Sequence, residues 1–254
     1  MPNPYPILEY DPARVAILEP RAPKDLNPLP ARAILCFFQE VLSALRDEGR
    51  LVQIDRLRSE IGEHPIYCLT TPTGDLTVMH PMVGAPLAAA TVEELAVRGV
   101  RSFIACGGCG VLRPEIAAGH PVVLTSAVRD EGTSYHYLPP GREVQPGPLA
   151  TAALEAACQQ VGIEYRLGKS WTTDAIYRET AARRALRLAE GCDVVEMEAS
   201  AFFAVAQFRG LELGQIVYGG DLVVPEGWDS RAWDRRLADR RLMFDIAVEA
   251  CQRL

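Results

Sequence analysis

Hydrophobic residues fall into short apolar runs that alternate with longer stretches of helical periodicity. Apolar runs bounded by glycine or proline predict buried strands, and apolar positions three or four residues apart predict helices. The predicted strands are Arg14–Leu18, Ile66–Thr70, Leu76–His80, Ser102–Cys106, Val122–Ser126, Tyr165–Gly168, Asp193–Glu196 and Gln215–Tyr218. The predicted helices are Ala31–Glu48, Pro86–Arg98, Leu149–Gln160, Glu179–Glu190, Ala199–Phe208 and Arg231–Gln252. This alternation predicts an α/β protein, in which helices cover a mainly parallel or mixed sheet.

The 254 residues show no internal repeat and no low-complexity tract. The only stretch that resembles a linker is Pro20–Pro30, with four prolines, and it lies too near the start to separate two domains. We therefore expect one domain over residues 1–254, a length that buries a sizeable core.

Composition narrows the function classes. A hydrophobic share of 48% and a charged share of 23% are ordinary for a globular protein. The net charge of −7 speaks against a nucleic-acid partner, which favours a basic face. No apolar run approaches the roughly 18 residues of a membrane span. The start, MPNPYPILEYDPAR, lacks the basic tip and apolar run of a signal peptide. We expect a cytoplasmic protein with no membrane partner.

Seven scattered cysteines, an odd number, are typical of a protein of the reducing cytosol. Cys106 and Cys109 form a C-x-x-C pair, a spacing also found in zinc and redox sites. Two glycines lie between them, and the chain offers no second ligand pair at a comparable spacing. We interpret the pair as small residues in a tight turn and expect no metal site.

Polar and glycine-rich segments follow several predicted strands, which is where open α/β sheets bind ligands. The four segments are RSFIACGGCGVL, SAVRDEGTSYHYLPPG, SWTTDAIYRET and GCDVVEMEASAFFAVAQFRG. The first also fits a dinucleotide-binding loop, with Asp130 about 20 residues further on. That interpretation needs a helix after the glycines, and Pro114, Gly119 and Pro121 oppose one. A tight turn without a ligand remains an alternative.

The two acids of the fourth segment do not form a catalytic pair on one helix face. Glu196 and Glu198 are two residues apart, so on a helix they point in nearly opposite directions. This spacing excludes the paired carboxylates of a glycosidase. An acid in the first turn of a helix is stabilised by the helix dipole, which gives a purely structural alternative.

Taken in order, these segments resemble the nucleoside phosphorylase family, which includes purine nucleoside phosphorylases, uridine phosphorylases and related nucleosidases. The strand and glycines of RSFIACGGCGVL, the loop sequence DEGTS, WTTDAIYRET and VVEMEASAFFAVA carry the resemblance. It runs from about Leu76 to Asp221 and continues weakly to the C-terminus. It implies a three-layer αβα fold with a mixed central sheet.

The resemblance also implies roles for individual residues. Met197 and Glu198 match the pair that contacts ribose, with the glutamate accepting hydrogen bonds from the 2′- and 3′-hydroxyls. Those bonds hold the sugar while an oxocarbenium-like transition state forms. Asp221 matches the aspartate that donates a proton to the leaving base in purine-specific members, an acid role that anionic leaving groups need.

Further implied roles concern the base and the anion. Ile176, Tyr177 and Arg178 match residues that pack against the base. Gly107 and Gly108 fall beside the anion site, and Arg129 is the arginine that we expect there.

Three phosphate contacts of the family are missing or displaced. Family phosphorylases carry a glycine turn of the form G-D-P-x-R after the first strand, whereas VAIL here runs into Glu19 and Pro20. Ala105 stands where an arginine is expected, and Gly108 where a threonine is usual. Candidates for a replacement contact are Arg21, Arg32, Arg113 and Arg129, since a guanidinium can bind an oxyanion in a bidentate manner.

Three functions therefore stay open. The first is phosphorolysis of a purine or pyrimidine nucleoside, with phosphate as co-substrate and no other cofactor. The second is hydrolysis by a nucleosidase, with Glu19 as a candidate base for the water. The third is a nucleoside-binding protein without catalysis. The resemblance also implies a homo-oligomer (dimer, trimer or hexamer), and an arginine among Arg231, Arg235 and Arg236 that pairs with Asp221.

Overall fold

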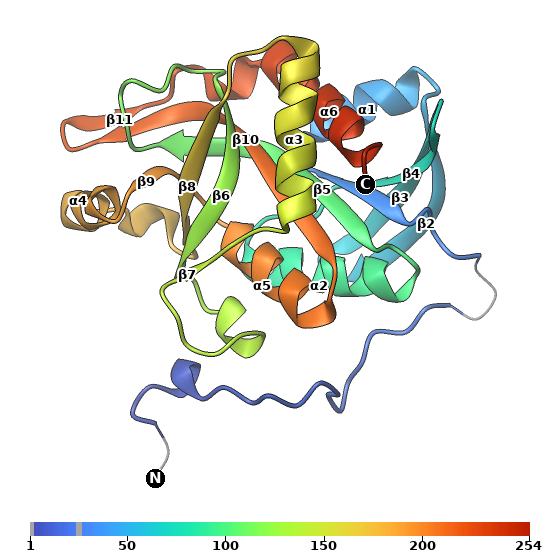
Figure 1. The fold of residues 1–254 in the computed structure, drawn as a ribbon, viewed down its shortest axis with the longest axis horizontal. Helices are drawn as coiled ribbons and strands as arrows, with labels where there is room; N and C mark the ends of the chain where they lie inside the picture. The colour runs from blue at the N-terminus through green and yellow to red at the C-terminus, as the bar shows by residue number, and fades with distance from the viewer. Residues whose placement is uncertain (1–2, 24–26) are drawn as a thin grey trace.

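A mixed sheet of eleven strands forms the middle layer of the computed structural model (Figure 1), which describes residues 3–23 and 27–254. Its order is β11-β10-β6-β8-β9-β5-β1-β4-β3-β2, and β7 pairs with β6. The strands are β1 (Arg32–Cys36), β2 (Leu51–Ser59), β3 (Gly62–Thr71), β4 (Gly74–Met79), β5 (Ser102–Val111), β6 (Pro121–Asp130), β7 (Glu143–Val144), β8 (Arg166–Thr173), β9 (Cys192–Glu196), β10 (Glu212–Val224) and β11 (Gly227–Asp229).

Helices cover both faces of this sheet, so the predicted three-layer α/β architecture is confirmed. Along β1, Ala33 and Leu35 face one hydrophobic cluster while Ile34 and Cys36 face the other, because successive side chains of a strand point to opposite faces. The first cluster includes residues of α2 and α5, and the second includes residues of α1, α3 and α6. The helices are α1 (Gln39–Asp47), α2 (Ala85–Val97), α3 (Pro148–Val161), α4 (Ala181–Ala189), α5 (Ala199–Arg209) and α6 (Leu237–Cys251).

The strands on one side of the sheet close into a ring. β10 pairs with β5 as well as with β6, and β9 pairs with both β8 and β5, so β5, β10, β6, β8 and β9 follow one another in a closed ring. Trp171, Val128 and Val195 form a third hydrophobic cluster, against which Leu188 of α4 packs. Short 3₁₀ helices connect the elements: η1 (Pro6–Leu8), η2 (Ser134–His136), η3 (Ile176–Arg178) and η4 (Trp233–Arg235). Closing the ring places β9 and β10 on either side of β5.

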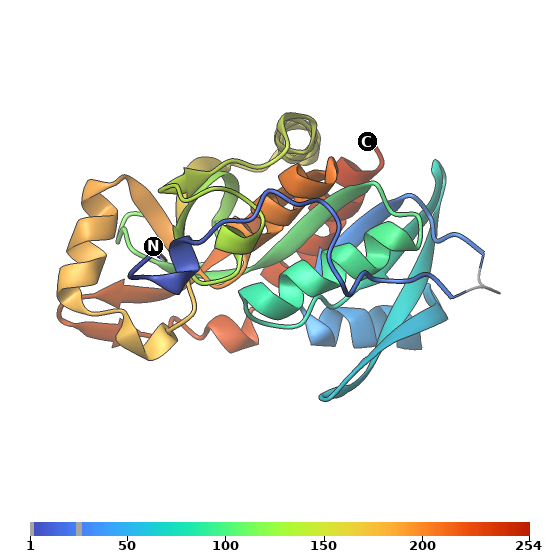
Figure 2. The ribbon, with the colours of Figure 1, turned by 90° about the horizontal axis from the view of Figure 1, so that it is seen from below.

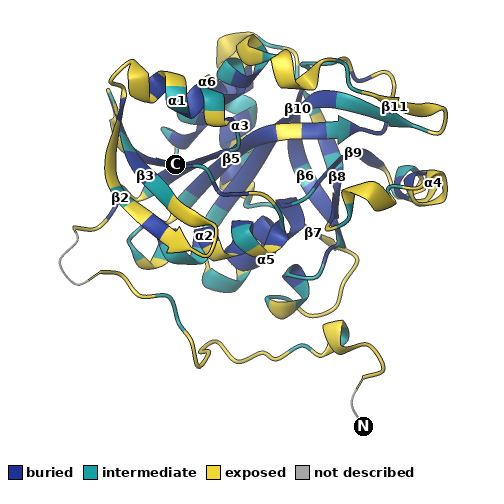
Figure 3. Ribbon diagram, turned by 180° about the vertical axis from the view of Figure 1, so that it is seen from behind, coloured by how far each residue is buried: buried dark blue, intermediate teal, exposed yellow. Residues whose placement is uncertain are grey.

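The N-terminal prediction was wrong. The expected strand Arg14–Leu18 is an extended segment without strand pairing, with Ile17 and Leu18 108% and 87% exposed. Figures 2 and 3 show this segment crossing the surface, almost wholly exposed. The first strand lies instead at Arg32–Cys36, inside the expected helix Ala31–Glu48. Four of its five residues are buried, and the helix begins only at Gln39.

Four other elements differ from the prediction. The expected helix Arg231–Gln252 begins only at Leu237, after the 3₁₀ helix η4. Strands β2 and β11 were not predicted, because their residues are mostly polar or exposed, and the two-residue β7 is too short to show a pattern. Among the described residues, no helix has the length and hydropathy needed to span a membrane.

The expected glycine turn is part of strand β5. Gly107, Gly108 and Gly110 lie where other elements approach closely: a methyl group added at these positions would lie 3.0 Å from Phe37, 3.3 Å from Tyr218 and 2.8 Å from Val195. The glycines therefore serve close packing rather than a turn. The segment after Val111 contains no α-helix, which agrees with the argument against a dinucleotide-binding loop.

Candidate active site

The junction between β9 and α5 is fixed by one buried carboxylate. Glu196 is the last residue of β9, and the hydroxyls of Ser170 and Thr172 donate to its Oε1 at 2.7 and 2.6 Å. The backbone amides of Glu198 and Ala199 donate to its Oε2 at 2.7 and 2.6 Å. These four hydrogen bonds tie two strands to the first turn of α5. The structural alternative considered from the sequence, an acid that stabilises the helix start, therefore fits Glu196.

The carboxylate of Glu198 accepts fewer hydrogen bonds than that of Glu196. It is 6% exposed, and the hydrogen bond that its carboxylate receives comes from the Gly84 amide, 2.6 Å from Oε1. Burial, reinforced by the nearby Glu196, raises the pKa of Glu198 to about 8. Burial also raises the pKa of Glu196, but its four donors oppose that effect. Among the described residues, Oε2 of Glu198 accepts no hydrogen bond of this kind, so this oxygen is available for a ligand.

A second buried acid joins the polar loop after β6 to this junction. The amides of Thr133 and Ser134 donate to Oε2 of Glu131 at 2.5 and 2.9 Å. The Ser200 hydroxyl, in the first turn of α5, donates to Oε1 at 2.8 Å. The sequence predicted that this loop borders the site, but no sequence pattern indicated the hydrogen bond that Ser200 of α5 donates to Glu131.

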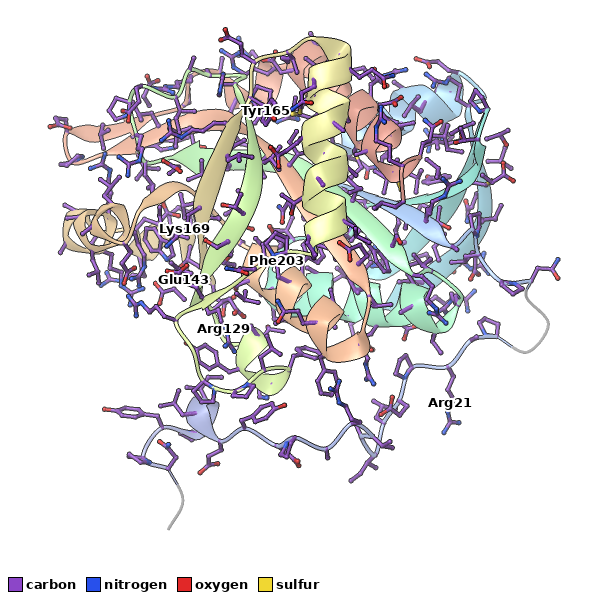
Figure 4. The ribbon with its side chains drawn as sticks, in the orientation of Figure 1. Arg21, Arg129, Glu143, Tyr165, Lys169 and Phe203 are labelled. Carbon is purple, nitrogen blue, oxygen red and sulfur yellow. The ribbon has the colours of Figure 1, made fainter. Side chains whose placement is uncertain are left out.

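The guanidinium of Arg129 is engaged inside this same loop. Its Nε donates to the Ser134 hydroxyl at 2.9 Å, Nη1 to the Pro139 carbonyl at 2.8 Å and Nη2 to the Leu138 carbonyl at 3.1 Å. Figure 4 shows Arg129 beside the loop, and burial lowers its pKa. This geometry does not support the anion-binding role expected for Arg129, because all three nitrogens already hold the loop.

The other candidate arginines lie away from the junction. Arg21 is exposed on the N-terminal segment (Figure 4). Arg32 donates to two backbone carbonyls, and Arg113 forms an ion pair with Asp193 at 2.6 Å. None of them supplies the missing phosphate contact.

Aromatic residues occupy the end of β1, where the family carries its glycine turn. Phe37 and Phe38 follow the strand directly, and the Phe37 ring packs against Gly107. Its centroid lies 5.9 Å from His80 and 6.3 Å from Phe202. Burial lowers the pKa of His80, which keeps this imidazole neutral. The departure was expected after Arg14–Leu18, which is not a strand; the apolar run ILCFF marks the first strand of the sheet.

Asp221 lies on β10, on the other side of β5 from Glu198. Its Oδ2 accepts a hydrogen bond from Nε1 of Trp228 at 2.7 Å. A methyl group added at Gly110 of β5 would lie 3.5 Å from the same oxygen, and Gly110 pairs with Val195 of β9. The structure thus gathers Asp221 and the β9–α5 junction around the end of β5. Burial, with the charge of Asp221, raises the pKa of the nearby Glu179 to about 7.

The arginines expected to pair with Asp221 are engaged elsewhere. Arg231 donates to the Ile116 carbonyl at 2.8 Å, and Arg236 pairs with Asp239 at 2.8 Å. Among the described residues Asp221 forms no ion pair, and Arg235 forms none either. Asp221 instead accepts a hydrogen bond from the indole of Trp228.

The residues expected to pack the base lie on η3, which follows β8. Ile176 is 54% exposed and Tyr177 is 95% exposed, while Arg178 is exposed as well. β8 runs parallel to β9 with Thr172 opposite Glu196, so η3 leaves the sheet at the same end as Met197 and Glu198. Met197 itself is half-buried. The structure therefore gathers these predicted residues at one end, with the base side open.

Glu19 lies in a different part of the surface. It is paired with Arg209 at 3.5 Å and lines a hollow of about 310 Å³ beside α2. A second hollow, of about 130 Å³, lies further along the N-terminal segment. Neither hollow is lined by Glu198 or Asp221. The prediction that Glu19 follows the first strand was wrong, and it is no base for a water at the junction.

Comparison with known proteins identifies the family of this chain. A family model described as the phosphorylase superfamily matches residues 31–254. A guanosine phosphorylase of Halorubrum lacusprofundi is 33% identical over 175 residues, which span 69% of this chain and 70% of the relative. A uridine phosphorylase of Treponema pallidum is 31% identical over 166 residues, which span 61% of this chain and 64% of that protein.

Solved structures show the same fold. A purine nucleoside phosphorylase from Toxoplasma gondii is similar with a TM-score of 0.74 at 22% identity, over 93% of this chain and 97% of that one. An AMP nucleosidase from Bacteroides thetaiotaomicron gives a TM-score of 0.69 at 21% identity, over 89% and 87%.

Proposed function

This chain belongs to the phosphorylase superfamily, and from that premise we propose that it cleaves the N-glycosidic bond of a nucleoside and transfers the pentosyl group to phosphate. The observation that carries the proposal is Glu198, a buried carboxyl with one oxygen held by Gly84 and the other available beside the ends of β5 and β9. A buried acid whose bonding is incomplete is typical of a binding site, because burial of such a group otherwise only costs stability.

On the sugar side, Glu198 accepts hydrogen bonds from the 2′- and 3′-hydroxyls, and Met197 packs against the ribose. These bonds strengthen as positive charge develops at the anomeric carbon, so they lower the barrier as well as bind the substrate. Glu196 contributes indirectly: its four hydrogen bonds fix the backbone that carries Glu198.

On the base side, the C1′–N bond breaks and its electron pair leaves with the base nitrogen. Asp221 hydrogen-bonds the departing base and supplies its proton. Ile176, Tyr177 and Arg178 cover the base. An oxygen of the acceptor forms the new bond to C1′, which gives a pentose 1-phosphate when the acceptor is phosphate.

Water is the second candidate acceptor, and one observation favours it. Phe37 fills the end of β1, where phosphorylases of the family carry the glycine turn that binds phosphate. Arg32, Arg113 and Arg129 are engaged in other contacts and Arg21 lies exposed on the N-terminal segment, so an arriving dianion meets an aromatic wall and a neutral His80. The names of the relatives favour phosphate, whereas this wall favours water.

The test measures release of free base from purine and pyrimidine nucleosides, with and without phosphate, together with the identity of the sugar product. Base release that requires phosphate and yields a pentose 1-phosphate supports the main proposal. Release without phosphate that yields free pentose identifies a nucleosidase. If this protein binds nucleosides by calorimetry but releases no base under either condition, it is a binding protein and the proposed chemistry is wrong.

A further inference from the structure

We propose that Trp228 is a positioning residue for Asp221, which it holds in the orientation needed to protonate the leaving base. This inference rests on the proposed function and adds a residue to its base side. Nε1 of Trp228 donates a hydrogen bond to Oδ2 of Asp221 at 2.7 Å, and among the described residues the Asp221 side chain accepts no other.

The hairpin formed by β10 and β11 sets this geometry. Its two strands are antiparallel, with Val223 opposite Trp228 and Leu222 opposite Asp229. Trp228 therefore lies diagonally across from Asp221, within the reach of a large side chain. The indole is 63% exposed, so burial of apolar surface does not account for a tryptophan at this position.

Strand β5 limits the carboxyl from the other side. A methyl group at Gly110 would lie 3.5 Å from Oδ2 of Asp221 and 2.8 Å from Val195. The clash would be with Val195, whereas the distance to Oδ2 is an ordinary contact, so the backbone of β5 lies directly beside the carboxyl. Oδ2 therefore lies between the indole and the backbone of β5, and Oδ1 remains available to a base.

A neutral donor has a particular consequence for the acid. The indole N–H only donates, and it carries no charge. It fixes one oxygen of a side chain whose last torsion is otherwise broad, without adding the positive charge that an arginine would bring. Small errors in the orientation of a catalytic group lower the reaction rate. The bond therefore raises kcat for substrates whose turnover is limited by proton transfer to the base.

The inference predicts a dependence on the leaving group. Trp228→Phe keeps a ring on the hairpin but removes the N–H. We expect its kcat on the best nucleoside substrate to fall about tenfold, the effect of losing one neutral hydrogen bond. Cleavage of 4-nitrophenyl riboside, whose leaving group needs no proton, should be unchanged. Trp228→Gln, which restores an N–H donor, should recover part of the loss on the nucleoside.

Trp233→Phe is the matched control. Trp233 is also exposed. Its backbone carbonyl accepts hydrogen bonds from Tyr218 and Arg240, and the substitution keeps this carbonyl. It should leave both substrates unaffected. Trp228→Phe with wild-type kcat on the nucleoside, or with equal losses on both substrates, would overturn the inference. A wild-type protein that cleaves neither substrate would instead reject the proposed function, and the inference with it.

Discussion

Glu198 and Asp221 lie on opposite sides of strand β5, and the protein holds them in different ways. Glu198 is 6% exposed and follows a junction fixed by the four hydrogen bonds of Glu196. Asp221 is half-buried, next to a hairpin whose tryptophan is 63% exposed. The proposed sugar side is thus organised by the core, whereas the proposed base side depends on a single hydrogen bond and an exposed 3₁₀ helix.

This difference indicates which side can change during evolution. Substitutions around Glu196 disturb buried hydrogen bonds and core packing, which are costly to lose. Substitutions on η3 or on the β10–β11 hairpin affect exposed residues and cost little stability. We infer that sugar recognition is the constant part of this site and base recognition the adjustable part.

The largest expected effect is the loss of the sugar contact. Glu198→Gln keeps the size of the side chain and an oxygen for the Gly84 amide, but it removes the charge that two hydroxyls would contact. Hydrogen bonds to a charged group contribute about 1.5–3 kcal/mol each, so we expect kcat/KM to fall at least about a hundredfold. The measurement is steady-state base release.

Glu60→Gln is the control for this substitution. Glu60 lies at the exposed turn between β2 and β3, and in the sheet β2 and β3 are far from β9. The activity of the Glu60→Gln variant should match that of the wild type. Wild-type kcat/KM in Glu198→Gln would show that the buried carboxyl does not bind the sugar.

The second prediction concerns pH. Because the pKa of Glu198 is raised to about 8, the carboxylate form needed by the sugar hydroxyls becomes scarce below that pH. The kcat/KM should therefore fall about tenfold per pH unit below about pH 8. Glu198→Gln should lack this part of the profile.

Stability should change in the opposite direction. The pKa of Glu198 lies above its unfolded value of 4.5, so between these values the folded state binds a proton that the unfolded state has lost. The free energy of unfolding therefore falls as pH rises from about 4.5 to about 8 and then levels off. Thermal unfolding of the wild type and of Glu198→Gln across this range checks the sign. Parallel Tm curves for the two proteins would mean that Glu198 titrates normally.

The sequence was most informative where hydrophobic pattern and buried structure agree. The helices α2 to α5 were expected within two residues of their observed bounds, and the strands β3 to β10, apart from the two-residue β7, were expected in place, although several extend four to six residues beyond the predicted bounds. Apolar runs between glycines identify such elements, because both faces of the central strands are buried. The β9–α5 junction was expected for the same reason. No sequence pattern, however, distinguishes the four hydrogen bonds of Glu196 from the single hydrogen bond of Glu198.

The part of the chain before β3 was less predictable for a physical reason. The sequence VAIL is as apolar as AILCFF, but it lies exposed while the latter crosses the core. Composition alone does not distinguish an apolar segment that finds strand partners from one that does not. The hydrogen bond between Trp228 and Asp221 was missed because β11 has only three residues, all exposed, and a strand this short has no periodicity.

The smallest expected effect lies on the open base side. Tyr177 is 95% exposed, so Tyr177→Ala should change the free energy of unfolding by less than about 0.5 kcal/mol. If its ring packs on the base, the substitution removes an aromatic contact of about 0.5–1.5 kcal/mol and should raise the KM for nucleosides roughly three- to tenfold. Ile61→Ala, at an exposed position on the β2–β3 turn, should raise neither KM nor Tm. A Tyr177→Ala protein with wild-type KM would remove η3 from the base site and leave the hairpin of β10 and β11 as the element that contacts the base.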